Sequence, residues 1–183
     1  MHPRVSELIA TLDRERAGVL AAIAAIPADA LQRRPAPDVW SAAHVVEHLR
    51  IVEAGTARLL ARRLARAREA GLPAETETDS VLGRLDHHRV VDGARRVAPE
   101  IVAPPADVSA EQALAGLAES REMLLAVLRD GDGLALGQVR ATHQLFGDID
   151  LYQWTLFVAL HEARHIRQLQ QLAAQLAEAP GSA

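Results

Sequence analysis

The C-terminal stretch from Asp150 to Gln175 limits the possible folds of this chain most strongly, because it reads as one long helix packed among others. Residues at steps of three and four form a single row that continues just past this stretch: Trp154, Val158, His161, His165, Gln168, Leu172 and Leu176. Such spacing is typical of the buried stripe of a helix. Two histidines and a glutamine lie on the stripe, although a buried polar group without a partner costs about 1–3 kcal/mol.

The two histidines of the stripe suggest a metal ion. His161 and His165 are four residues apart, so both imidazoles leave the same face of the helix. One shared metal ion would satisfy both of these inward side chains. The chain has no cysteine, which excludes disulfides, thiolate zinc sites and cysteine nucleophiles. Any metal must therefore be held by histidine and carboxylate side chains.

Three more stretches have the apolar spacing of long helices, and local signals mark their ends. The predicted helices cover Val5 to Ile26, Ser41 to about Ala70, Ser109 to Leu128, and Asp150 to Gln175. Ser41 is a candidate N-cap residue. Ser109 with Gln112, and Asp150 with Gln153, have the spacing of capping boxes. Gly71 and Pro73 are expected to end the second helix.

Four amphipathic helices predict an all-α fold, a four-helix bundle. With 183 residues, the chain suits one domain with a core from about residue 5 to residue 178. The connection from Pro73 to Asp107 is the longest, and we expect a short helix within Val81 to Val97. A connection of this length usually covers something or serves a site. We expect Leu136 to Ile149 to be a second connection.

Charge and hydropathy exclude several classes of function. The formal net charge is −4, with both signs mixed along the chain, so we expect no nucleic-acid partner. No apolar run approaches the length of a membrane span, and the N-terminal segment carries charges where a signal peptide needs an apolar core. We therefore expect a cytoplasmic protein that does not insert into a membrane.

The third metal ligand should come from a facing helix. A reactive metal site typically has three protein ligands and leaves one position for water or substrate. His48 is the best candidate because it lies on the inward face of the second predicted helix, and His44, one turn earlier, is its competitor. If His44 is not a ligand, we expect it to bond a ligand or a substrate. Gln168 follows His165 by one turn, where it could bond a ligand or a substrate, or simply pack.

The remaining polar and aromatic candidates have ordinary structural explanations. We expect His143 to be structural, in a loop, and His87 and His88 to lie on the surface. Glu162 points off the stripe and is expected to be a solvated salt-bridge partner. Trp154 is expected to lie in the core. The arginines that recur on the second helix are expected to form its solvated face: Arg50, Arg58, Arg62, Arg63, Arg66 and Arg68.

Three segments together resemble the DinB-like superfamily, which includes YfiT-type proteins described as metal-dependent hydrolases. They are WSAAHVVEHLRIVE (Trp40 to Glu53), ATHQLFGDIDLYQW (Ala141 to Trp154) and HEARHIRQL (His161 to Leu169). The last segment resembles the H-x-x-x-H-x-x-Q signature of that superfamily. Gln144 departs from the pattern, because a proline is expected after the loop histidine, and this affects the loop and not the ligands.

The resemblance implies a bundle with up-down-down-up wiring, frequent homodimers, and a metal ion held by His48, His161 and His165. Imidazole suits zinc, nickel, copper and iron alike, so the metal stays open. Three hypotheses remain. The first is an enzyme that acts on a small molecule, either as a hydrolase or as a transferase that uses an external low-molecular-weight thiol. The second is a metal-binding or stress-response module without turnover, and the third is a purely structural bundle.

Overall fold

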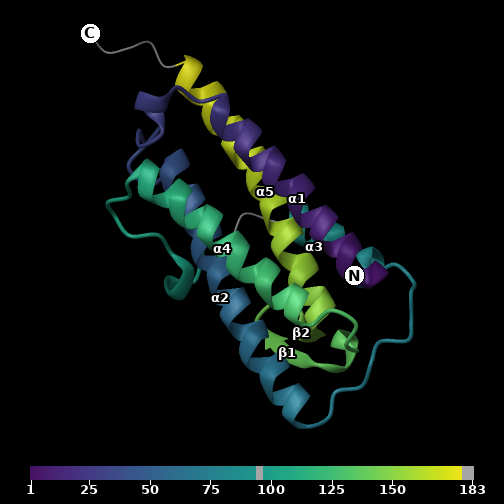
Figure 1. Ribbon diagram of the computed structural model, residues 1–183. Helices are drawn as coiled ribbons and strands as arrows, with labels where there is room; N and C mark the ends of the chain where they lie inside the picture. The colour runs from purple at the N-terminus through teal and green to yellow at the C-terminus, as the bar shows by residue number, and fades with distance from the viewer. Residues whose placement is uncertain (94–96, 179–183) are drawn as a thin grey trace.

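Four long helices make up most of the computed structural model, which describes residues 1–93 and 97–178 (Figure 1). They are α1 (Pro3–Ala24), α2 (Ala42–Glu69), α4 (Ala110–Asp130) and α5 (Leu151–Glu178). The shorter elements are α3 (His87–Val91), strands β1 (Arg140–His143) and β2 (Gly147–Asp150), and four 3-10 turns (Ala28–Ala30, Leu82–Arg84, Glu100–Val102 and Leu136–Gln138). The predicted four-helix bundle is confirmed. Within the described ranges, no helix has both the length and the apolar character that a membrane crossing requires.

The helices form two parallel pairs. Helix α1 packs on α5, and α2 packs on α4, while α2 and α5 also contact each other. The colour gradient of Figure 1 shows that α1 and α5 run in one direction and α2 and α4 in the other. This is the up-down-down-up wiring. Because α2 and α4 are parallel, the chain between them must return along the whole bundle, which explains the long connection.

The predicted helix boundaries agree closely with the structure, and the capping side chains make the expected bonds. Ser41 and Ser109 each accept a hydrogen bond from the backbone N–H three residues later, both at 3.4 Å. Asp150 and Gln153 bond each other's backbone N–H groups, both at 2.9 Å. Gly71 adopts a positive φ of 82° directly after α2, a conformation that glycine reaches without steric cost.

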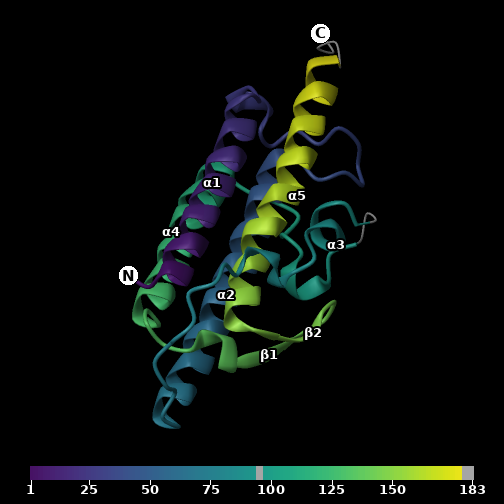
Figure 2. The same ribbon diagram turned by 90° about the vertical axis from the view of Figure 1, so that its right-hand side faces the viewer.

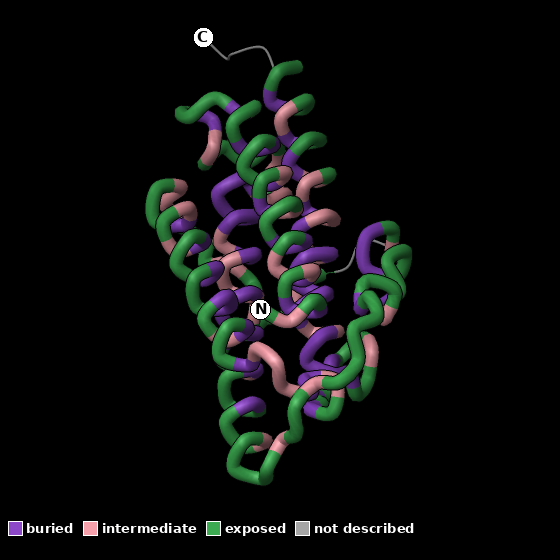
Figure 3. The backbone as a smooth tube through the Cα atoms, turned by 45° about the vertical axis from the view of Figure 1, so that its right-hand side comes forward, coloured by how far each residue is buried: buried purple, intermediate pink, exposed green. Residues whose placement is uncertain are grey.

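Two apolar clusters fill the bundle, one toward each end, and Figure 3 shows buried residues along the inner faces of the helices. One cluster includes Leu12, Leu60, Leu124 and Leu156. The other includes Val19, Val45, Leu117 and Leu172. Each fully buried side chain of this kind stabilises the fold by about 1.5–3 kcal/mol. On each long helix, polar side chains lie between the two clusters, and together these side chains form a polar layer across the bundle.

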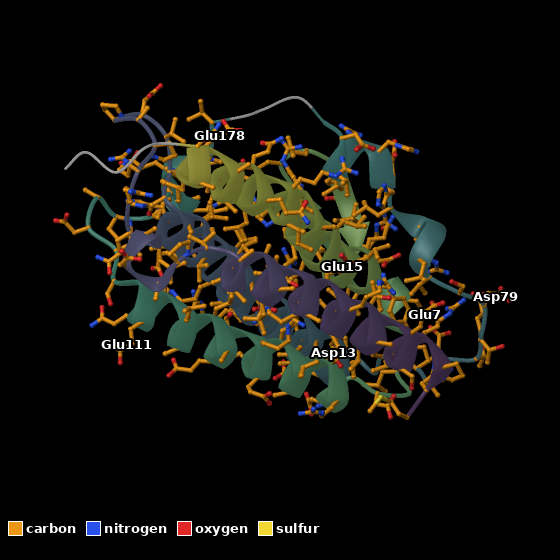
Figure 4. All side chains as sticks on the ribbon, turned by 90° about the horizontal axis from the view of Figure 1, so that it is seen from above. Glu7, Asp13, Glu15, Asp79, Glu111 and Glu178 are labelled. Atoms are coloured by element: carbon orange, nitrogen blue, oxygen red, sulfur yellow. The ribbon has the colours of Figure 1, made fainter. Side chains whose placement is uncertain are left out.

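The centre of the polar layer is a group of four charged side chains, one from each long helix, which we call the charge quartet. Arg16 donates to Glu162 at 2.8 Å and to Glu53 at 2.7 Å. Arg121 donates to Glu53 at 2.7 Å and to Glu162 at 3.0 Å. Each carboxylate is only 1% exposed. The acidic side chains labelled in Figure 4, such as Asp13, lie instead on the outside of the bundle.

The expectation that Glu162 is solvated is therefore wrong. Its sequence position shows that it points away from the histidine stripe, but not that Arg16 and Arg121 lie opposite it. Burial raises the pKa of Glu162, while the positive charges of Arg121 and Arg16 oppose that shift. Buried charges are tolerated when they are paired and hydrogen-bonded, and the two arginines meet that condition.

The segment from Leu136 to Ile149 is not the plain connection that we expected, because it contains a β-hairpin. Strands β1 and β2 pair antiparallel, with Arg140 opposite Asp150. The hairpin lies beside the beginning of α5 (Figure 2). The indole nitrogen of Trp154 donates to the carbonyl oxygen of Ala141 at 3.1 Å, which fastens the hairpin to that helix.

Candidate metal centre

Three histidines from two facing helices converge at one point beside the charge quartet. His48 belongs to α2, and His161 and His165 are one turn apart on α5. The Nε2 atom of His161 lies 3.3 Å from Nε2 of His48 and 3.1 Å from Nε2 of His165. His48 and His165 are buried, and His161 is half-buried. The structure thus brings together all three side chains predicted as ligands.

Hydrogen bonds fix the tautomers of two of these rings. His48 Nδ1 lies 2.8 Å from the carbonyl oxygen of Val102, and His165 Nδ1 lies 2.7 Å from Oε1 of Gln168. The carbonyl of Val102 can only accept, so Nδ1 of His48 must carry a proton; with Oε1 of Gln168 turned toward His165, Nδ1 of His165 donates to it in the same way. In each neutral ring, Nε2 then carries no proton, and its lone pair is directed at His161. Gln168 therefore bonds a candidate ligand, His165, which is one of the roles that we considered for it.

Burial keeps the three imidazoles neutral. It lowers the pKa of His165 to about 3 and also lowers the pKa of His48. The pKa of His161 falls well below its ordinary value, first through burial and then through the neighbouring His165 and His48. A neutral ring with a proton on Nε2 has one donor there. His161 can therefore satisfy only one of the two lone pairs that face it.

A single cation would satisfy all three nitrogens at once. Two nitrogens bound to one ion at about 2.0–2.1 Å lie about 3.3 Å apart in tetrahedral geometry and about 3.0 Å apart in octahedral geometry. The two Nε2 separations, 3.3 Å and 3.1 Å, fall in this range. The ligand nitrogens of the third pair, His48 and His165, lie within 4.8 Å of each other, and three imidazole nitrogens are donors that suit a divalent transition metal.

Aromatic rings pack against the cluster, and the positive charge of Arg164 adds to burial and the neighbouring histidines in lowering the pKa values of His161 and His165. Phe157 stacks on His161 with ring centroids 5.4 Å apart, and Trp40 lies 5.1 Å from His48. The bonds that orient His48 and His165 come from a carbonyl and an amide, not from carboxylates. An ion on three neutral imidazoles would keep its full positive charge, which favours an anionic fourth ligand.

His44, the competing candidate, lies outside the cluster. Its Nδ1 is 2.7 Å from the hydroxyl of Ser41 and its Nε2 is 3.0 Å from the carbonyl oxygen of Ala106. Both ring nitrogens are therefore engaged in hydrogen bonds within the protein. His44 and His48 are one turn apart on α2, but only the latter faces α5.

The other histidines lie outside the cluster, and His143 lies in a strand and not in the loop that we expected. His143 ends β1, buried with its ring 4.5 Å from Phe157 and 4.8 Å from Trp154. Its Nδ1 accepts from a backbone N–H at 3.1 Å, and burial lowers its pKa to about 4. His87 and His88 are exposed, as predicted. They form a second, exposed group with Asp92, whose carboxylate bonds Arg167 at 2.5 Å and His88 at 2.8 Å.

The sequence did not identify the contacts behind the ligands. The oxygens that bond His48 and His44 are main-chain carbonyls of Val102 and Ala106, and every residue has such a carbonyl. The one sequence feature that pointed to these contacts was the length of the connection in which Val102 and Ala106 lie.

Comparisons with known proteins agree with this fold. A family model described as the DinB superfamily matches residues 11–169. A comparison with curated proteins finds no significant match. Among solved structures, the chain is similar to TT2238, described as a four-helix bundle protein, at 22% sequence identity and a TM-score of 0.61. That alignment covers 91% of this chain and 98% of the other, and at such identity it shows the fold alone.

Proposed function

The chain belongs to the DinB superfamily, and on that premise we propose that it is a metal-dependent enzyme with one divalent ion on His48, His161 and His165. The ion would be zinc, nickel or iron, and one coordination position would remain open for a small molecule. We also propose that the protein acts as a homodimer, as the family resemblance implies.

One observation carries the proposal. His48 and His165 each have Nδ1 committed to an oxygen acceptor, so both direct an Nε2 lone pair at His161. Histidines that serve only the core would be expected to pair donors with acceptors. Metal-ligating histidines commonly donate the other ring N–H to a carbonyl or a carboxylate, and the carbonyl of Val102 corresponds to that arrangement.

The chemistry follows from the donor set. A divalent ion in this place would act as a Lewis acid that lowers the pKa of a water or a thiol bound at the open position. Val102 and Gln168 hold the ligand rings of His48 and His165 in the required tautomer. Phe157 packs against His161 and Trp40 against His48, so apolar surface covers one side of these two rings. Because the chain has no cysteine, a thiol must come from a separate small molecule, and the reaction is either hydrolysis or thiol transfer.

Metal analysis of protein purified without a histidine tag tests the site. The wild type, grown with zinc, nickel and iron present, should contain about one ion per chain. The double variant His161→Ala/His165→Ala should contain none. The matched control is His87→Ala/His88→Ala, which removes two exposed histidines and should retain the ion. A wild type without metal, or equal losses in both double variants, would refute the proposal.

Turnover separates the enzyme from a binding module without catalysis. Ester, amide and electrophilic substrates would be offered to the metal-loaded protein, the electrophiles with and without an added thiol. Activity that disappears in His161→Ala/His165→Ala supports the enzyme. A loaded protein that turns over none of these classes would favour the non-catalytic alternative.

A further inference from the structure

The segment of residues 97–108, which we call the strap, connects α3 to α4 and lies against the histidine face of α2. Two histidines of α2 bond its main chain. His44 Nε2 is 3.0 Å from the carbonyl oxygen of Ala106, and His48 Nδ1 is 2.8 Å from that of Val102. The two histidines are four residues apart in the sequence, and so are the two residues whose carbonyls they bond. The two hydrogen bonds therefore attach the strap to α2 at two points.

The two histidines carry their protons on opposite nitrogens. The carbonyl of Ala106 can only accept, so His44 must donate from Nε2. Its Nδ1 is then the acceptor for the hydroxyl of Ser41, at 2.7 Å. His48 instead donates from Nδ1 and leaves Nε2 for the metal centre. The carbonyl of Ala106 therefore fixes the tautomer of His44, as that of Val102 fixes the tautomer of His48, and the Ser41 hydroxyl donates to the remaining nitrogen of His44.

Apolar packing holds only part of the strap, because Val102 and Val108 are half-buried while other apolar side chains are exposed. Its large apolar side chains include Val97, 95% exposed, and Ile101, 81% exposed. Val108 packs against the apolar cluster that contains Val19 and Leu172, but it lies at the far end of the strap, six residues from Val102. The hydrogen bond from His44 anchors the strap four residues from the carbonyl that orients His48, closer along the chain than Val108.

We propose that His44 is a positioning residue for the metal centre. It holds the strap at Ala106, and the strap in turn holds the carbonyl of Val102 against Nδ1 of His48. Without His44, the carbonyl moves away, and His48 loses the bond that keeps its ring oriented with Nε2 free. The effect on metal affinity rests on the proposed function, whereas the effect on the His48 tautomer does not.

Three variants test this role. His44→Leu removes the donor at similar volume. His44→Gln retains an N–H donor that can reach Ala106 and should rescue the loss. His87→Leu makes the same change at an exposed histidine and is the matched control. Nitrogen-15 NMR of the imidazoles, on metal-free protein, reports which nitrogen of His48 carries the proton.

The expected result is a protonated Nδ1 on His48 in the wild type, in His44→Gln and in His87→Leu, and a mixture of both tautomers in His44→Leu. Zinc affinity, measured by competition with a chelator, should fall about 10-fold in His44→Leu, the lower end of the range for losing a bond behind a ligand. An unchanged His48 tautomer in a folded His44→Leu, or no rescue by His44→Gln, would overturn the proposal.

The outcomes also separate this inference from the proposed function. If the wild type binds no zinc, the proposed function fails, and the His48 tautomer still decides the role of His44. If zinc binds equally to the wild type and His44→Leu, only the positioning role fails. If His44→Leu does not fold, nitrogen-15 NMR of His44 in the metal-free wild type replaces it. His44 should carry its proton on Nε2, the nitrogen that faces the carbonyl of Ala106, and a proton on Nδ1 would overturn the proposal.

Discussion

Replacing Arg121 by methionine should destabilise the protein strongly, because this arginine is half of the positive charge in the charge quartet. Arg121 is 5% exposed. It donates to Glu53 at 2.7 Å, to Glu162 at 3.0 Å and to the carbonyl oxygen of Leu12 at 2.7 Å. Methionine has a similar length and no charge, so in Arg121→Met two buried carboxylates would share Arg16 alone.

The magnitude follows from the uncompensated charge. Removing one partner of a buried ion pair costs about 3–5 kcal/mol. One carboxyl would then bind a proton more readily, so its pKa in the folded state would rise above its unfolded value. A group with a raised folded pKa stabilises below its unfolded pKa and loses that contribution as the pH rises through the folded pKa. The loss caused by Arg121→Met should therefore be larger at pH 7 than at pH 5.

Urea unfolding of metal-free protein measures this loss. The matched control is Arg68→Met, which breaks an exposed pair with Asp130, 2.7 Å apart. Exposed pairs contribute about 0–1 kcal/mol, so the control should unfold almost like the wild type. If Arg121→Met lies within about 1 kcal/mol of Arg68→Met, or if its loss grows on acidification, the account of the charge quartet is refuted.

Three further results are expected. Gln168→Leu removes the acceptor of His165 Nδ1 and should weaken zinc binding at least about 10-fold in a chelator competition; unchanged affinity would contradict this. Burial lowers the pKa of His143 from 6.5 to about 4, so only the unfolded state gains a proton between these values. His143 alone should therefore contribute about 3 kcal/mol to the loss of stability from pH 6.5 to pH 4 in urea titrations, and His143→Phe should lose less stability than the wild type by about that amount. Zinc at about 100 times its Kd should add about 2.7 kcal/mol of stability in the wild type and nothing in His161→Ala/His165→Ala; equal shifts would place the ion elsewhere.

The helices and their ends were predictable because their signals are local. The apolar spacing of α5 and the capping pair of Asp150 and Gln153 depend on residues a few positions apart. The same holds for His161 and His165, whose common face follows from helical geometry alone. His48 needed one further step, the assumption that the inward faces of α2 and α5 meet.

Features that depend on distant residues were not predictable from the pattern. Glu162 was assigned to solvent because nothing near it in the sequence indicates Arg16 or Arg121, which come from other helices. The strands of the hairpin are four residues each, too short for a clear alternation against a helix-rich background. The contacts of the strap are made by main-chain carbonyls, which any sequence provides.

Anomalous diffraction from crystals of metal-loaded protein, measured at the absorption edge of the bound metal, tests the central claim most directly. The account predicts one strong peak within bonding distance, about 2.0–2.2 Å, of the Nε2 atoms of His48, His161 and His165. No peak at that position, or a peak only at the exposed group of His87, His88 and Asp92, would contradict it.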